Sequence, residues 1–243
     1  MLIILIFIFG LIIGSFINVI IYRLPRHISI ISPGSRCPFC EHPLTFLNLI
    51  PGLSFFLQKG KCSYCGHPLS PVYPLVEGMA AIAFVLVYLQ VGLSIELFAG
   101  WALTGILITA AFIDGQFGII PDRLTYTAAV IALLFSFFTV GFVSGLIGML
   151  FLGGLFFLVA FLSKGGMGGG DVKLAVSIGL MCGWPAAWWA FFLSSVLAAV
   201  YGAALLITGK ADMKTAIRFG PFLAGGGFLA WLYSSIWFSG WGL

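Results

Sequence analysis

Residues 1–23 read MLIILIFIFGLIIGSFINVIIYR, an apolar run whose first charge is Arg23, with Arg26 close behind it. About 20 consecutive apolar residues are enough for a helix to cross the hydrocarbon core of a bilayer. A secretory signal would instead carry its basic residues ahead of the apolar run and small residues at its end. We therefore interpret residues 1–22 as a first membrane span that stays in the protein.

The composition of the whole chain agrees with this interpretation. Of its 243 residues, 61% are hydrophobic and 7% are charged, whereas an average soluble domain has about 25% charged residues. Charges, prolines and glycine runs divide the chain into eight apolar segments, at residues 1–22, 74–91, 95–113, 119–139, 141–163, 172–184, 185–207 and 219–238. The sequence predicts an all-α polytopic membrane protein with about eight transmembrane helices. Seven spans is the alternative, because the sixth segment is short and only Gly141 separates the fourth from the fifth.

The basic residues predict the orientation, because Lys and Arg collect in cytoplasmic loops. With the N-terminus outside and eight alternating spans, all 11 Lys and Arg fall on the cytoplasmic side. They are Arg23, Arg26, Arg36, Lys59, Lys61, Arg123, Lys164, Lys173, Lys210, Lys214 and Arg218. Basic loops beside anionic headgroups account for the net charge of +4, so the expected partner of these charges is membrane lipid, and no nucleic acid is expected.

Residues 23–73, called the cysteine loop below, are the one substantial polar region and contain CPFC and CSYC. Four thiolates in two C-x2-C turns suit the tetrahedral coordination of zinc. The predicted ligands of this structural zinc ion are Cys37, Cys40, Cys62 and Cys65. The sequence thus predicts a small cytoplasmic zinc ribbon inserted between the first span, residues 1–22, and a polytopic membrane domain, residues 74–243.

Two histidines in this loop and one cysteine outside it are also of types that could bind a metal ion. His42 and His67 follow the two cysteine pairs, and we expect them to be neighbours of the metal, because four thiolates already close the site. Two disulfides are the alternative to zinc, but they would need an oxidising compartment. Cys182 lies alone in an apolar segment and is expected to be a buried structural thiol.

Two aspartates are the candidate functional residues of the membrane region. Asp114 ends the third predicted span in AFIDGQFGIIPDRLTY, and Asp171 follows the glycine run of SKGGMGGGDVKL. The predicted topology puts both on one side, at comparable depth, where an ionisable residue is a functional candidate by default. If the two carboxylates meet, one can activate a water and the other can protonate a leaving amide, which is aspartic peptidase chemistry. Carboxylate pairs also serve proton or cation transport, so both functions remain open.

The remaining acidic residues have simpler interpretations. Asp122 follows Pro121 and precedes Arg123, so it could cap the next helix or pair with the arginine. Glu41, Glu96 and Asp212 fall in predicted loops, and Glu77 in the second predicted span is ambiguous. The glycine run leaves room for an extended substrate, and its alternative is a hinge whose aspartate caps the following helix.

Six motifs, in order along nearly the whole chain, resemble those of the type 4 prepilin peptidases, which belong to the GxGD membrane aspartyl proteases. They are GSFINVIIYRLP at 14–25, the two cysteine pairs, YPLVEG at 73–78, IDGQFGIIPDRLT at 113–125, GGMGGGDVKL at 165–174 and FGPFLAGG at 219–226. The resemblance implies an enzyme of the bacterial cytoplasmic (inner) membrane that cleaves the basic leader of prepilins and pseudopilins at the cytoplasmic face. It implies that Asp114 and Asp171 are the catalytic pair and that Asp122 is not catalytic.

The resemblance also implies a second activity. Members of the family with a cysteine loop methylate the new N-terminus with S-adenosylmethionine, and this chain is expected to do the same. No nucleotide-binding fingerprint occurs in the sequence, so the methyltransferase site is not placed by it. The alternatives from other classes are a transporter of ions or small solutes that uses the two aspartates, and a non-catalytic scaffold for pilus or secretion assembly.

Overall fold

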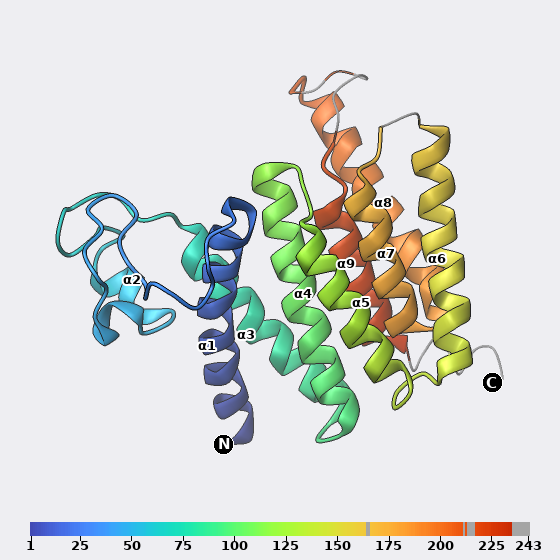
Figure 1. The fold of residues 1–243 in the computed structure, drawn as a ribbon, viewed down its shortest axis with the longest axis horizontal. Coiled ribbons are helices and arrows are strands. Elements are labelled where there is room, and N and C mark those ends of the chain that lie inside the picture. Colours follow the sequence, from blue (N-terminus) through green and yellow to red (C-terminus); the bar gives the residue numbers. More distant parts are fainter. Residues whose placement is uncertain (164–165, 211, 213–216, 235–243) are drawn as a thin grey trace. The chain divides into compact units, whose positions relative to one another are not determined.

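The computed structural model describes residues 1–163, 166–210, 212 and 217–234. Within them the regular secondary structure is helical, apart from two isolated bridges in the cysteine loop (Figure 1). The helices are α1 (Leu2–Arg23), η1 (Leu24–Arg26), η2 (Phe46–Leu49), α2 (Leu53–Leu57), α3 (Val72–Val91), α4 (Ile95–Phe117), α5 (Asp122–Ser136), α6 (Phe142–Leu162), α7 (Gly169–Cys182), α8 (Ala186–Ile207) and α9 (Gly220–Leu232). The prediction of an all-α protein is confirmed.

Each predicted apolar segment contains one long helix. Among the described residues, five are long and apolar enough to cross a membrane: α1 with η1, α3, α4, α6 and α8. Helices α5, α7 and α9 have 15, 14 and 13 residues, fewer than the roughly 20 of a perpendicular span. The protein is a multi-pass membrane protein, and the count of eight spans stays a prediction. Residues 235–238 of the last segment, with Lys164 and Lys214, lie outside the described residues.

The end of α4 differs from the predicted boundary at residue 113. The helix continues to Phe117, and Gly118 ends it with a φ of 69°, a left-handed conformation that glycine adopts at little steric cost. The N–H of Gly118 donates to the carbonyl of Asp114 at 2.8 Å. Asp114 therefore lies inside the last turn of α4, where the helix fixes the direction of its side chain.

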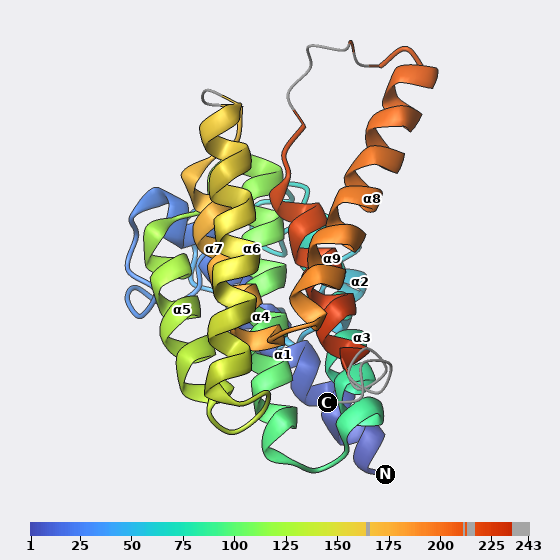
Figure 2. The ribbon, with the colours of Figure 1, turned by 90° about the vertical axis from the view of Figure 1, so that its right-hand side faces the viewer.

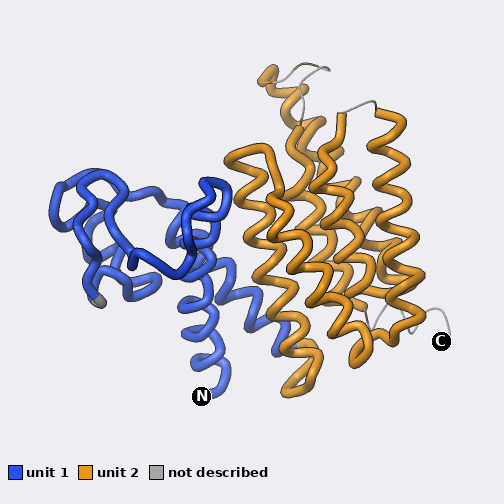
Figure 3. The backbone as a smooth tube through the Cα atoms, viewed as in Figure 1, with its two compact units in different colours: residues 1–89 blue, residues 90–243 orange. Residues whose placement is uncertain are grey.

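The chain divides into two compact units, Met1–Leu89 and Gln90–Leu243 (Figure 3). In the first unit α1 packs closely on α3 because Gly10 and Gly14 have no side chains. A Cβ at Gly10 would lie 2.5 Å from the Cα of Ala81, and one at Gly14 would lie 2.6 Å from the Cα of Glu77. Small residues four apart allow this approach between membrane helices.

In the second unit, α6 packs on α7, α8 packs on α9, and α4 contacts both α5 and α9. Helix α7 also contacts α5 and α9. The C-terminal end of α4 and the N-terminal ends of α5, α7 and α9 lie at one end of this unit (Figures 1 and 2). The topology of the helices alone therefore places the segments that carry Asp114 and Asp171 at the same end.

The contact between α6 and α7 gives a testable prediction of stability. A Cβ at Gly148 would overlap the carbonyl oxygen of Gly179, so Gly148→Ala must separate the two helices. We expect the variant to lose about 1–3 kcal/mol of unfolding free energy, seen as a lower midpoint of thermal unfolding in detergent. Gly154→Ala is the matched control on the same helix, since nothing lies within 4 Å of a Cβ there. Equal midpoints for the two variants would contradict this packing.

Candidate active site and metal centre

The four predicted zinc ligands of the cysteine loop are brought together. The Sγ atoms of Cys37, Cys40, Cys62 and Cys65 all lie within 4.8 Å of one another. The Sγ atoms of Cys37 and Cys65 are 3.9 Å apart, much longer than the roughly 2.05 Å of a disulfide, and all five cysteines of the chain are free. This cluster has the donor set and the spacing for a metal such as zinc.

The two halves of the cluster are built alike. In the first, the N–H of Cys37 donates to the carbonyl of His42 at 3.0 Å, and in the second the N–H of Cys62 donates to that of His67 at 2.8 Å. An isolated bridge flanks each turn, Arg36 with Pro43 and Lys61 with Pro68. These turns aim the two sulfurs of each C-x2-C segment at one point, so the sequence repeat is also a structural repeat.

The histidines pack across the cluster and are not part of it. The ring of His67 stacks on Phe39 with centroids 3.3 Å apart, and the ring of His42 stacks on Tyr64 at 3.6 Å. The ring of each histidine therefore packs on an aromatic ring of the other half of the cluster. The backbone N–H groups of Cys65 and Tyr64 lower the pKa of the Cys62 thiol, which favours one thiolate in the cluster.

Asp114 lies where α4 meets the beginning of α9, and 6% of it is exposed. Its Oδ2 accepts a hydrogen bond from the N–H of Gly220 at 2.9 Å. The guanidinium of Arg218 donates to the carbonyl of Gly115, and its positive charge is near enough to act on Asp114. One carboxylate oxygen is thus fixed by backbone, in a position that an N-terminal helix dipole favours for an anion.

Asp171 lies in the first turn of α7, and 8% of it is exposed. Its Oδ1 is buried and has no hydrogen-bond partner among the described residues. The preceding Gly170 lies against the loop after α4, since a Cβ there would be 2.9 Å from the Cβ of Ile120. A buried carboxylate oxygen without a partner is costly, which indicates a functional position.

The structure brings Asp114 and Asp171 to the same end of the second unit. Helix α9 contacts both α4, which carries Asp114, and α7, which carries Asp171. Two buried carboxylates at one end of a helix bundle are the groups that an aspartic peptidase uses as acid and base.

The structure corrects one prediction about Asp122. Its carboxylate makes no cap, and it pairs with the Nζ of Lys173 at 2.6 Å and not with Arg123. The two side chains are 58% and 39% exposed, so solvent screens the ion pair and it adds little to stability. It joins the beginnings of α5 and α7 beside Gly170.

Cys182 is fully buried as predicted, and its thiol faces the carbonyl of Gly227.

Sequence reasoning did not single out Gly220, Arg218 or Lys173 for the aspartate site. The first two lie in or beside FGPFLAGG, whose contact with Asp114 spans 106 residues of chain. The motif was the only sign in the sequence that Gly220 has a role in the site. A glycine followed by a proline is otherwise typical of an ordinary helix start.

Comparison with known proteins places this multi-pass protein with two buried aspartates in a family. A family model described as the bacterial peptidase A24 N-terminal domain matches residues 8–91, and one described as the type IV leader peptidase family matches residues 101–203. A Bacillus subtilis (strain 168) protein named prepilin leader peptidase/N-methyltransferase is 40% identical over 93% of this chain and 92% of its own length. Proteins of the same name from Aeromonas salmonicida and Aeromonas hydrophila are 33% and 34% identical, each over 94% of this chain and 90% of their own length.

The chain belongs to the type IV leader peptidase family, so the resemblance inferred from the six motifs is confirmed. No solved structure matches it.

Proposed function

We propose that this protein removes the leader peptide from type IV prepilins and pseudopilins and then methylates the new N-terminus. The names of its relatives support both activities. The observation that supports the peptidase is the burial of Asp114 and Asp171 at the same end of the second unit, with Asp171 Oδ1 unpartnered among the described residues. Such a pair of carboxylates can hydrolyse a peptide bond without a metal ion.

In the proposed reaction the ionised carboxylate takes a proton from a water as the water oxygen attacks the scissile carbonyl carbon. The protonated carboxyl then gives its proton to the amide nitrogen, and the C–N bond breaks. The Gly220 N–H holds one oxygen of Asp114, while Asp171 Oδ1 stays free to meet the water. The glycines before Asp171 offer room for an extended substrate to approach.

The location of the site supports a reaction at the cytoplasmic face. Among the described basic residues of the second unit, Arg123 and Lys173 lie near the beginnings of α5 and α7, Arg218 precedes α9, and Lys210 follows α8. These helix ends lie at the same end of the unit as the C-terminus of α4 and the N-terminus of α7 (Figure 1). The positive-inside rule then puts this end toward the cytoplasm and the N-terminus outside. A prepilin would arrive with its apolar helix in the bilayer and its basic leader in the cytosol, so partitioning into the membrane positions the scissile bond.

The cysteine cluster has a structural role in this proposal. Cys37, Cys40, Cys62 and Cys65 would hold a zinc ion that organises residues 23–73 between the first span and the membrane domain, residues 74–243. Four thiolates leave no open coordination position, so the metal does not take part in hydrolysis.

The transporter and scaffold alternatives gain no specific support. A cation path would need ionisable side chains spread along the second unit, but its buried acids among the described residues are Asp114 and Asp171, at one end. A scaffold would not require two buried carboxylates at one end of the unit.

Co-expression with a tagged prepilin, in a host that lacks its own processing enzyme, tests the function. We expect the tagged protein to shorten by its leader and, by mass spectrometry, to carry one added methyl group at the new N-terminus. A prepilin that stays at full length while this protein is present in the membrane would contradict the proposal.

Gly220→Ala tests the positioning of Asp114 without changing a charge. The new Cβ would lie 2.7 Å from Oδ2 and 2.8 Å from the Cβ of Asp114, so the carboxylate must move. We expect the cleavage rate to fall about tenfold to a hundredfold, because displacements near 1 Å have effects of that size. Gly225→Ala on the same helix meets only Leu197 at 3.4 Å and should cleave like the wild type. A normal rate for Gly220→Ala would remove Gly220 from the site.

A further inference from the structure

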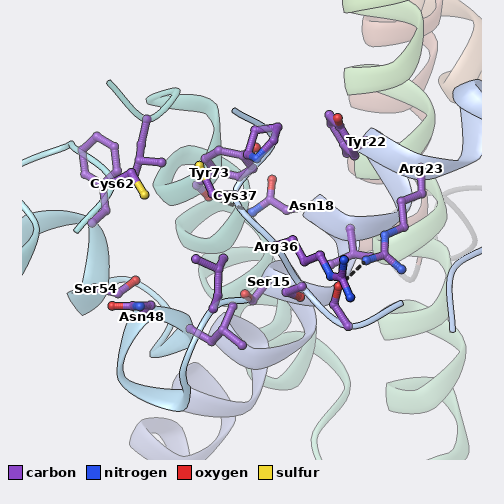
Figure 4. A pocket seen from close by; sticks show the side chains of 18 of the residues that line it. Ser15, Asn18, Tyr22, Arg23, Arg36, Cys37, Asn48, Ser54, Cys62 and Tyr73 are labelled. Carbon is purple, nitrogen blue, oxygen red and sulfur yellow. Dashed lines mark hydrogen bonds between the residues drawn. The ribbon is translucent and has the colours of Figure 1, made fainter. Parts of the chain in front are cut away.

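The first unit contains a cavity of about 450 Å³ (Figure 4). Its walls come from the end of α1, the cysteine loop and the beginning of α3, all within residues 15–77. Two of the cluster cysteines, Cys37 and Cys62, lie on its wall. The volume is in the range of about 300–1,000 Å³ that holds small ligands, and the peptidase mechanism makes no use of it.

One part of the cavity wall carries buried acceptors. Glu77 is 8% exposed and Asn18 is 6% exposed, and both line the cavity. The Glu77 Oε2 accepts the N–H of Gly52 at 2.7 Å, and a carboxylate has further acceptor capacity beyond that bond. Asn18 donates through Nδ2 to the carbonyl of Tyr73 at 3.0 Å, so its Oδ1 remains an acceptor. These groups suit the cationic part of a ligand.

The close packing of α1 on α3 creates this part of the wall. Gly14, one turn before Asn18, lets the backbone of α1 reach the backbone of Glu77. The side chains of Asn18 and Glu77 are therefore held by two helices and do not depend on a loop for their position. A buried carboxylate on a rigid pair of helices is the kind of group that orients a small ligand.

Other residues of the wall offer different chemistry. The guanidinium of Arg23 donates hydrogen bonds to the carbonyls of Ser29 and Gly34 and so holds this part of the loop in the cavity wall. Arg36 is exposed and lines the cavity, where it can meet a carboxylate. Tyr22 and Tyr73 add aromatic rings, on which a flat heterocycle can lie. The cavity thus combines acceptors for a cation, a donor for an anion and aromatic surface.

We propose that this cavity binds S-adenosylmethionine, with Glu77 and Asn18 facing its ammonium and sulfonium charges and Arg36 facing its carboxylate. The proposal rests on the methyltransferase part of the proposed function. In the reaction, the neutral amine at the new N-terminus forms a bond to the methyl carbon, and the C–S bond breaks with its electrons going to sulfur. The amine then loses a proton to solvent, and S-adenosylhomocysteine remains.

The test measures binding separately from activity. The purified full chain in detergent is dialysed to equilibrium against radiolabelled S-adenosylmethionine, and prepilin cleavage is measured on the same samples. Glu77→Gln keeps an acceptor for the Gly52 N–H but removes the charge, and it should weaken binding about tenfold or more. It should also raise the KM for S-adenosylmethionine when the methyl acceptor is a pilin that already lacks its leader.

A second variant keeps the test decisive if Glu77→Gln folds poorly. Ser54→Trp puts a large ring into the cavity wall and should abolish saturable binding while cleavage continues. Leu57→Trp is the matched control on the same helix, because Leu57 is 67% exposed and does not line the cavity. It should bind like the wild type.

Several outcomes would overturn the proposal. Unchanged binding in both cavity variants would place the ligand elsewhere. A wild type that cleaves prepilin but binds no S-adenosylmethionine would show that this molecule is not the ligand of the cavity. Loss of cleavage with intact binding in Ser54→Trp would assign the cavity to the prepilin. Failure of the peptidase proposal is distinguishable, because the wild type would then bind S-adenosylmethionine through this cavity without cleaving prepilin.

Discussion

Asp114→Asn and Asp171→Asn should each lower the rate of prepilin cleavage by about a thousandfold or more. Asparagine keeps the shape of the side chain but can neither accept the proton of the attacking water nor deliver one to the leaving nitrogen. The Gly220 N–H can still meet the asparagine carbonyl, so the fold should be kept. The measurement is the initial rate with purified protein and a prepilin in detergent.

Asp122→Asn is the matched control for these two variants. It makes the same change from carboxylate to amide at the same end of the second unit. Asp122, however, is 58% exposed and pairs with Lys173. Losing that ion pair should change the cleavage rate by no more than about threefold. Cleavage that survives in Asp114→Asn or Asp171→Asn, or that is lost in Asp122→Asn, would mean that the pair has been assigned to the wrong residues.

Cys62→Ser should remove most of the bound zinc and the order of the cysteine loop. Structural zinc in small peptide sites contributes about 10–16 kcal/mol of apparent binding free energy, and a hydroxyl is a far weaker ligand than a thiolate. We expect the purified wild type to carry one zinc per chain by elemental analysis, and the variant to carry about tenfold less. The loop of the variant should also be cut faster by added protease.

Cys182→Ala is the control for that experiment, because this thiol is fully buried and lies outside the cluster. It should keep the zinc content of the wild type. A wild type purified under reducing conditions without bound metal, or a Cys62→Ser variant with full zinc content, would contradict a four-thiolate site.

The sequence was sufficient for features that depend on neighbouring residues. Apolar run length predicted the helices, because each backbone group in a bilayer must be satisfied within its own segment. The two C-x2-C turns predicted the cysteine cluster, since each turn supplies two ligands locally. The boundary of α4 was predicted less well, because a polar Asp114 suggested the end of the helix, whereas Gly118 ends it one turn later.

Features that depend on distant contacts could not be predicted in this way. The N–H of Gly220 reaches Asp114 across 106 residues, and Lys173 reaches Asp122 across 51. Neither pairing has a local pattern, so Arg123, next to Asp122, was the natural but wrong partner. The close approach of α1 to Glu77 of α3 at Gly14 likewise could not be predicted, because a single sequence does not show which helix face a glycine meets.

In the proposed function, this chain hydrolyses prepilins with water activated by Asp114 and Asp171. Its most direct test is one mass spectrum of the products that the purified wild type forms from a prepilin in isotopically labelled water with S-adenosylmethionine. We expect a free leader whose new carboxylate carries heavy oxygen, and a mature pilin with one added methyl group. A prepilin recovered at its original mass would contradict the proposed function.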